Sequence, residues 1–98
     1  MPAVRDNPRE LRYELVDDGK VIGEILYRRE PGAVALVHTE VDPAYEGHGL
    51  ANLLVEGAVE DLRTRGLRMI PVCPYVRAWL QRHPEQADIV TADPATPD

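Results

Sequence analysis

Hydrophobic and polar positions alternate in three stretches of the N-terminal part of the chain, which is the period of β-strands whose two faces differ. The predicted strands are Arg9–Val16, Val21–Arg29 and Ala33–Val41. Asp18 and Gly19 between the first two strands form a strong hairpin signal, and Pro31 and Gly32 mark a second turn. The pattern therefore predicts an antiparallel three-stranded meander.

The spacing becomes helical in the second half of the chain. Apolar residues recur there at intervals of three and four and form one stripe, namely Ala51, Leu54, Val55, Ala58 and Leu62. This stripe predicts a helix over Leu50–Arg65. A fourth strand is expected at Leu67–Val72, and it should run parallel to the third because a helix connects the two. A second helix is expected at Pro74–His83, since Pro74 suits a first helical position and Pro84 cannot continue the helix.

The composition is that of one small domain. The chain has 98 residues, 44% of them hydrophobic, and we assign the domain to residues 1–92 with a disordered tail at 93–98. No apolar run approaches the ~20 residues of a membrane-spanning helix, and the N-terminus lacks the apolar stretch of a secretory signal. A single cysteine cannot form an internal disulfide. We therefore expect a cytoplasmic protein that does not use a membrane as partner.

The net charge of −6 bears on the choice of partner. Lys and Arg do not cluster with aromatic residues, so the basic footprint of a nucleic-acid-binding protein is missing from the sequence. An acidic protein favours a cationic partner such as an amine, although the same charge is also explained by solubility alone. The three histidines and one cysteine lack the spacing of a metal site, so no metal is expected.

A glycine turn lies between the third predicted strand and the first predicted helix, in the segment E-V-D-P-A-Y-E-G-H-G-L-A (40–51). Gly47 and Gly49 permit positive φ and close approach of a ligand. The first turn of the following helix has free N–H groups and the positive end of the helix dipole, a combination that binds phosphate. The dinucleotide-binding fingerprint is not met, because Asn52 stands at the third glycine position.

Cys73 directly precedes Pro74, so it would cap the second helix. A thiol at a helix N-terminus is favoured as thiolate. The alternative is a small buried hydrophobic residue, which is a common role of cysteine. Tyr75 and Trp79 are four residues apart on the same helix and are expected to pack in the core rather than to stack on a substrate.

Two histidines and a glutamate near the glycine turn could also take part in chemistry. His38 and Glu40 are two residues apart on one strand and therefore share a face, where they could take a proton from an ammonium group. A solvated polar pair is the alternative. His48 lies between the two glycines, where it could cover a phosphate or simply be exposed.

The glycine turn resembles the acetyl-CoA loop of the GNAT N-acetyltransferases, which has the pattern Gln/Arg-x-x-Gly-x-Gly/Ala after a strand ending in Val-x-Pro. The strand end V-D-P (41–43) fits, Gly49 and Ala51 match the fourth and sixth positions, and Glu46 departs from the expected Gln or Arg. The minimal GNAT-like proteins of about a hundred residues are similar in four segments: H-T-E-V (38–41), Y-E-G-H-G-L-A (45–51), P-V-C-P-Y-V (71–76) and R-H-P-E (82–85).

This resemblance implies a minimal GNAT-like α/β (α+β) fold, with a mainly antiparallel sheet of three to four strands and two helices. It implies an acyltransferase that moves acetyl from acetyl-CoA to a primary amine of a small molecule or a protein, without a metal. The implied coenzyme A site comprises Thr39, Val41, Glu46, Gly47, His48, Gly49, Leu50, Ala51 and Asn52. The implied catalytic residues are Cys73, Glu40 and His38.

Several alternatives stay open at this level. Cys73 could carry the acetyl group or only line the site, and direct attack of the amine with Glu40 as base is preferred because exchange between two thioesters gains little energy. The chain is too short for the extra elements with which larger relatives build an acceptor site, so it could be a non-catalytic module that binds CoA or acyl-CoA. Glu46 suggests a third possibility, a structural domain with a vestigial site. The sequence does not indicate the oligomeric state.

Overall fold

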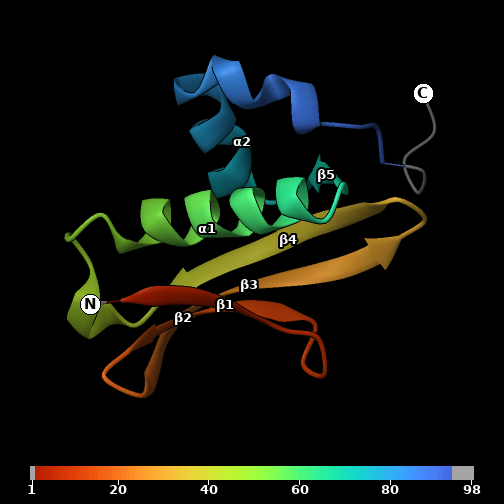
Figure 1. The fold of residues 1–98 in the computed structure, drawn as a ribbon. Coiled ribbons are helices and arrows are strands. Elements are labelled where there is room, and N and C mark those ends of the chain that lie inside the picture. Colours follow the sequence, from red (N-terminus) through yellow and green to blue (C-terminus); the bar gives the residue numbers. More distant parts are fainter. Residues whose placement is uncertain (1, 94–98) are drawn as a thin grey trace.

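The computed structural model describes residues 2–93 and arranges them as a curved five-stranded sheet with helices packed against it (Figure 1). The elements in chain order are β1 (Ala3–Asn7), β2 (Arg12–Asp17), β3 (Lys20–Glu30), β4 (Ala33–Val41), the 3-10 helix η1 (Pro43–Tyr45), α1 (Leu50–Thr64), β5 (Arg68–Pro71), α2 (Pro74–Arg82) and the 3-10 helix η2 (Pro84–Ile89). The strands lie in the order β1-β2-β3-β4-β5. Neighbours are antiparallel except β4 and β5, which are parallel.

The predicted meander is present as β2, β3 and β4, and α1 makes the crossover to the parallel β5. Two expectations are wrong. The sheet has five strands rather than three to four, because β1 pairs along its whole length with β2. The strand expected from Arg9 begins only at Arg12, since residues 8–11 form a turn in which Leu11 has a φ of 53°. The predicted tail lies outside the described residues apart from Asp93, whose carboxylate binds Arg28.

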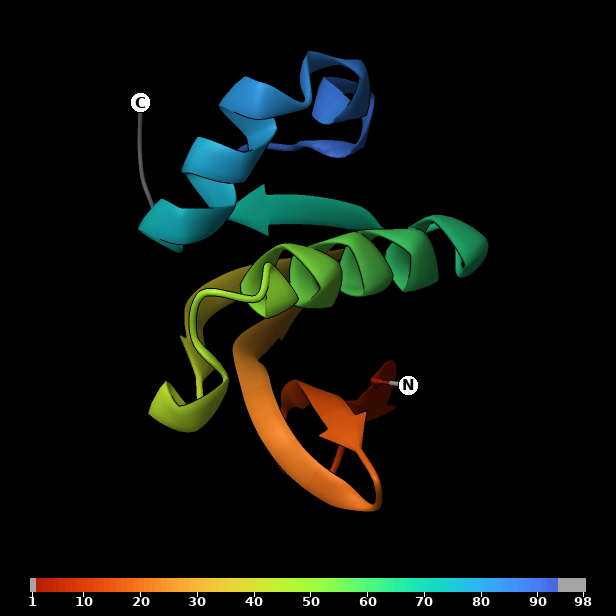
Figure 2. The ribbon, with the colours of Figure 1, turned by 90° about the vertical axis from the view of Figure 1, so that its left-hand side faces the viewer.

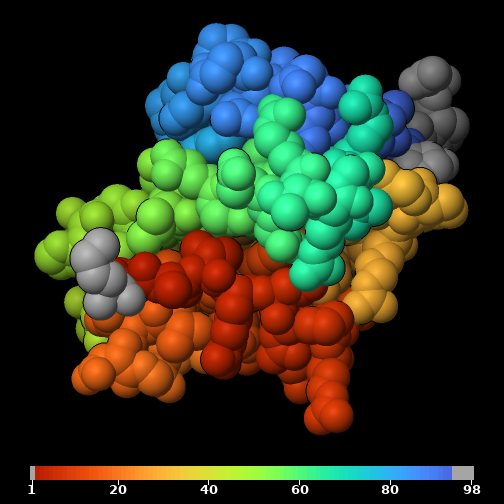
Figure 3. Space-filling model, in the orientation of Figure 1, coloured from red at the N-terminus to blue at the C-terminus, as the bar shows by residue number. Residues whose placement is uncertain are grey.

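One apolar core joins α1 and α2 to the sheet. Its fully buried members come from every layer and include Leu15, Ile25, Leu36, Leu54, Leu62 and Trp79. Helix α1 crosses the strands and lies directly on β1 (Figures 2 and 3). A Cβ added at Gly57 would come within 2.5 Å of the Val4 side chain, so this close contact between helix and strand requires glycine. No helix within residues 2–93 is long and apolar enough to cross a membrane.

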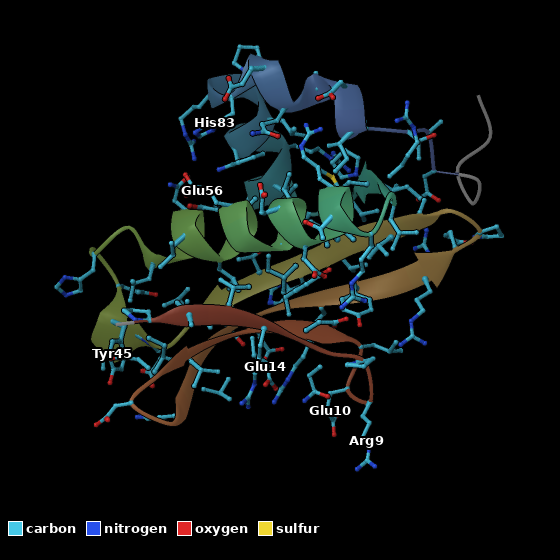
Figure 4. All side chains as sticks on the ribbon, in the orientation of Figure 1. Arg9, Glu10, Glu14, Tyr45, Glu56 and His83 are labelled. Carbon is cyan, nitrogen blue, oxygen red and sulfur yellow. The ribbon has the colours of Figure 1, made fainter. Side chains whose placement is uncertain are left out.

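The sheet face away from α1 carries a buried carboxylate. Glu14 is only 1% exposed, and its oxygens accept hydrogen bonds from Arg5 Nε at 2.8 Å, Asn7 Nδ2 at 3.0 Å and Arg12 Nε at 2.7 Å. Figure 4 shows Glu14 on the side of β1 and β2 opposite the helix. Burial by itself raises the pKa of Glu14, but the three donors outweigh it and lower the pKa to about 2.

A second polar network ties the sheet to the C-terminal end of α1. Tyr13 donates to Asp61 and Tyr27 donates to Asp6, each with an oxygen–oxygen distance of 2.6 Å. Arg65 then binds both aspartates, with nitrogen–oxygen distances of 3.1 Å. Burial, together with the neighbouring Asp6, raises the pKa of Tyr27 to about 12. The hydroxyls that enter the core are thus satisfied at this end of the molecule.

Candidate functional site

The turn between β4 and α1 is built by local chemistry. The Asp42 side chain accepts from the amide of Ala44 at 3.0 Å and so starts η1, and the Glu46 amide donates to the carbonyl of Pro43. Gly47 and Gly49 follow with φ of 85° and 71°. A Cβ at either glycine would meet nothing within 4 Å, so glycine is needed here for its left-handed backbone and not for space.

Helix α1 begins without a side-chain cap. Gly49 occupies the capping position, and the first backbone bond of the helix runs from the Leu53 amide to the Gly49 carbonyl at 3.2 Å. The amides of the three residues between them therefore have no partner within the helix. The Asn52 side chain does not cap either, because it donates to Glu56 at 3.0 Å (Glu56 is labelled in Figure 4). This helix start presents free donors and a positive dipole end to solvent.

Strands β4 and β5 separate beside this turn. Their parallel pairing ends at Leu36 and Pro71, whereas β4 continues to Val41. The paired part ends at the Leu36 carbonyl, which accepts hydrogen bonds from the amides of Val72 and Cys73 at 3.1 and 2.8 Å. The register of β3 and β4 shifts at the same level, and Val37 is the bulged residue. A gap therefore opens along β4 from Val37 to Val41.

A cavity of about 300 Å³ lies between the end of β4, the glycine turn and the start of α2. Its walls include every predicted cofactor residue except His48 and Asn52; they are Thr39, Val41, Glu46, Gly47, Gly49, Leu50 and Ala51. His48 is exposed on the turn. The structure thus brings the strand end and the glycine turn together around one hollow.

Tyr45 and Tyr75 also line this cavity, although neither was predicted to belong to the site. Tyr45 lies in η1, where Lys20 approaches both its ring, at 5.8 Å from the centroid, and Asp42, at 3.8 Å. Tyr75 is in the first turn of α2, where it is partly buried and packs against the core as expected. One sequence feature could have placed Tyr75 in the site: it follows Cys73, the predicted helix cap, by two residues.

Cys73 caps α2 as predicted, but its thiol is buried. The residue is 3% exposed, does not line the cavity, and its Sγ lies 3.4 Å from Thr39 Oγ1. Thr39 does line the cavity. The thiol therefore sits behind the Thr39 side chain, among the residues of the core.

His38 and Glu40 point away from Cys73. Because side chains alternate along a strand, the contact of Thr39 with Cys73 places His38 and Glu40 on the opposite face of the sheet. Both are exposed, and Glu40 lies across from Glu24 of β3 at the edge of a shallow hollow. The structure therefore keeps the pair together but separates it from the thiol by the thickness of β4. Within residues 2–93, three or more His, Cys, Asp or Glu side chains nowhere gather as a metal site would require.

Comparisons with known proteins agree with this geometry. A family model described as GCN5-related N-acetyl-transferase matches residues 12–89. The solution structure of a GCN5-like candidate N-acetyltransferase from Staphylococcus aureus is similar with a TM-score of 0.68 and 22% identity, over 93% of this chain and 89% of that chain.

A second solved structure is more distant. The crystal structure of ribosomal-protein-alanine N-acetyltransferase from Brucella melitensis biovar Abortus 2308 is similar with a TM-score of 0.55 and 18% identity, over 89% of this chain and 67% of that chain. At these identities the two structures show a shared fold. No curated protein matches the chain in sequence.

Proposed function

Because this chain belongs to the GCN5-related N-acetyltransferase family, we propose that it transfers acetyl from acetyl-CoA to a primary amine. One observation carries the proposal: the uncapped start of α1 and the gap between β4 and β5 open into the same cavity. The free amides of the glycine turn and of the first helical turn would hold the pyrophosphate. The gap would take the pantetheine arm.

The edge of β4 is suited to an arm that contains amides. The Asp42 amide donates to the Ile22 carbonyl of β3 at 2.8 Å. Backbone groups of successive strand residues face alternate sides, so those of Val41 and Thr39 face the gap. They are positioned to pair with the two amide groups of the pantetheine arm, as a neighbouring strand would.

The length of the arm sets the position of the thioester. Between its phosphate oxygen and its sulfur the arm has about as many bonds as the backbone of four extended residues, roughly 13 Å. An arm that starts at the glycine turn beside Val41 would thus bring its sulfur to the level of Val37. The gap between β4 and β5 closes there, at Leu36 and Pro71.

The transfer itself would be direct. The amine nitrogen attacks the thioester carbon, a C–N bond forms, the C–S bond breaks, and the CoA sulfur leaves as a thiolate that takes up a proton. The amine must lose a proton to a base on the protein or to water. An acetyl-Cys73 intermediate is disfavoured, because the Cys73 thiol is buried behind Thr39 and outside the cavity.

Calorimetry and an acetylation assay test this proposal together. We expect the protein to bind CoA and acetyl-CoA, and to acetylate at least one member of a panel of a polyamine, a lysine-containing peptide and a peptide with a free N-terminus. Mass spectrometry of the acceptor measures the product. Absence of CoA binding would contradict both the site and the activity. A free, buried thiol is compatible with the cytoplasmic location that the sequence predicts.

A module that binds CoA without catalysis is the competing function. The observation that favours it lies on the side of the gap from which an acceptor would approach. The acceptor side of the gap is a sheet face with a shallow hollow and no additional layer among the described residues. Tight CoA binding with no acetylation of any amine in the panel would establish this function instead.

A further inference from the structure

We infer that His38 accepts the proton of the attacking amine, and that the amine approaches on the sheet face opposite α1. The inference rests on the proposed function and adds to it the side of attack and the identity of the base. It chooses between His38 and Glu40, which the sequence places together on one strand face.

The position that the thioester would take along β4 favours His38 over Glu40 as the base. The gap closes at Leu36, and the length of the arm brings the sulfur to the level of Val37. His38 is the next residue along β4. Glu40 lies two residues farther toward the glycine turn, which is roughly 7 Å along a strand. A carboxylate at that level faces the middle of the arm rather than its reacting end.

The two faces of β4 differ in the space that they leave at this level. On the side of α1, Thr39 is in contact with Cys73, and Val76 and Trp79 of α2 are buried in the core. On the other side, His38 is exposed, and so is its cross-strand partner Leu26, at 37%. The face that carries His38 is open at this level, whereas the Thr39 face adjoins the core and the cavity that would hold the cofactor, so the amine would approach from the His38 face.

The His38 ring is available for proton transfer. Among the contacts of residues 2–93 it takes part in no hydrogen bond and no ion pair. In the strand register, Leu26 pairs with His38 on one side and with Arg12 on the other. Arg12 is already engaged, because it binds Glu14 at 2.7 Å and Glu24 at 3.4 Å. Glu24 in turn lies across from Glu40, two positions from His38.

The proton balance of the step is simple. A nitrogen of the His38 imidazole takes one proton from the bound ammonium, and the freed amine then attacks the acetyl carbon. As the C–N bond forms and the C–S bond breaks, the second proton of the nitrogen passes to the leaving thiolate of CoA, directly or through water. The imidazolium then returns its proton to solvent from the exposed face. No oxidant, reductant or metal is needed. General base catalysis by a positioned side chain is worth about 10²–10⁴-fold in rate.

Two nucleophiles of different basicity test this role. Butylamine, like the lysine side chain with its pKa of about 10.4, is protonated at neutral pH and must lose a proton before it attacks. Hydroxylamine is already unprotonated there. We expect His38→Gln to lower kcat for butylamine about a hundredfold and to lower the rate with hydroxylamine less than tenfold. The affinity for acetyl-CoA, measured by calorimetry, should stay within about twofold of wild type because the ring faces away from the cofactor.

Glu40→Gln and Glu10→Gln complete the experiment. Glu40→Gln should lower transfer to butylamine less than tenfold, well below the loss in His38→Gln. Glu10 lies in the exposed turn between β1 and β2, far from the gap (Figure 4), so its substitution controls for the change in net charge. Equal losses with both nucleophiles in His38→Gln, or a larger loss in Glu40→Gln, would overturn the assignment to His38 while leaving the acetyltransferase activity in place. A wild-type protein that binds acetyl-CoA but acetylates neither nucleophile would overturn the proposed transfer and this inference with it.

Discussion

The β1–β2 side of the sheet and the turn between β4 and α1 differ in how far their polar groups are hydrogen-bonded within the protein. On the β1–β2 side, Glu14 receives three hydrogen bonds, and the hydroxyls of Tyr13 and Tyr27 each reach an aspartate. At the β4–α1 turn, the helix starts at Gly49 without a side-chain cap, and β4 runs past the end of its pairing with β5. A satisfied group contributes stability, whereas a free donor or strand edge is available to a ligand. Stability and binding should therefore respond to different mutations.

Gly49→Val gives the largest expected effect on binding. The substitution places a β-branched side chain at a φ of 71°, on the turn whose amides would bind the pyrophosphate. We expect the affinity for CoA to fall at least about a hundredfold, or about 2.7 kcal/mol, by calorimetry.

Gly32→Val is the matched control for this substitution. Gly32 has a φ of 69°, and a Cβ there also meets nothing within 4 Å, but it lies in the β3–β4 turn at the other end of β4. Both variants should lose about 1–2 kcal/mol of unfolding free energy from the same backbone strain. CoA affinity should be lost only in Gly49→Val. Unchanged affinity in a folded Gly49→Val protein would remove the glycine turn from the site.

The acid dependence of stability tests the other region. The pKa of Glu14 is about 2 in the folded protein and 4.5 ordinarily, so its carboxylate stabilises the fold above pH 4.5 and this contribution is lost as the pH falls from 4.5 toward 2. We expect about 2 kcal/mol to be lost over that range, measured by urea unfolding at several pH values.

Glu14→Gln should flatten this part of the pH profile. Its CoA affinity at pH 7 should equal that of wild type, because Glu14 lies on the sheet face away from the cavity. Parallel pH profiles for the variant and the wild type would show that the three donors do not hold Glu14 ionised in the way that the structure indicates.

Glu46→Arg should raise the affinity for CoA and so test the turn between β4 and α1 in the opposite direction. Glu46 is exposed and lines the cavity beside the free amides, where its charge repels phosphate. Replacing it by a cation should tighten CoA binding several-fold, about 1 kcal/mol, and the gain should shrink as salt is added. Glu10→Arg makes the same change in net charge at a remote turn and should leave affinity unchanged. A weaker affinity in Glu46→Arg would mean that Glu46 itself contacts the ligand.

Cys73→Ala is expected to have the smallest effect on turnover. Since the thiol is 3% exposed and contacts Thr39 rather than the cavity, acetyl transfer should stay within about threefold of wild type. Mass spectrometry of the wild-type protein after exposure to acetyl-CoA should show no acetyl adduct on Cys73. An adduct that a chasing amine discharges at the rate of turnover would establish the thiol as an acetyl carrier and refute direct transfer.

Much of the architecture could be predicted from local sequence because its causes are local. Gly19 and Gly32 set the turns of the meander, and the helical stripe gave α1 to within one residue at its C-terminal end. The glycine turn was likewise recognisable, since positive φ at Gly47 and Gly49 is a property of the glycines themselves. Most of the predicted cofactor residues line one cavity for this reason.

The features that could not be predicted from the sequence depend on contacts between residues that are distant in sequence. The segment A-V-R-D-N does not alternate clearly, and it is a strand because β2 pairs with it and α1 packs on Val4 through Gly57. Glu14 has the sequence context of a solvent-facing residue and is buried because Arg5, Asn7 and Arg12 converge on it.

The candidate site likewise combines features set by local sequence with features set by contacts between distant residues. The sequence by itself determined that a strand, a glycine turn and a helix follow one another, because backbone preferences and periodicity act over a few residues. Only the tertiary structure decided where β4 and β5 separate, that Val37 is bulged, and that Cys73 and His38 lie on opposite faces of β4. These features arise from register and packing between strands, and a shift of one residue in register would exchange the two faces.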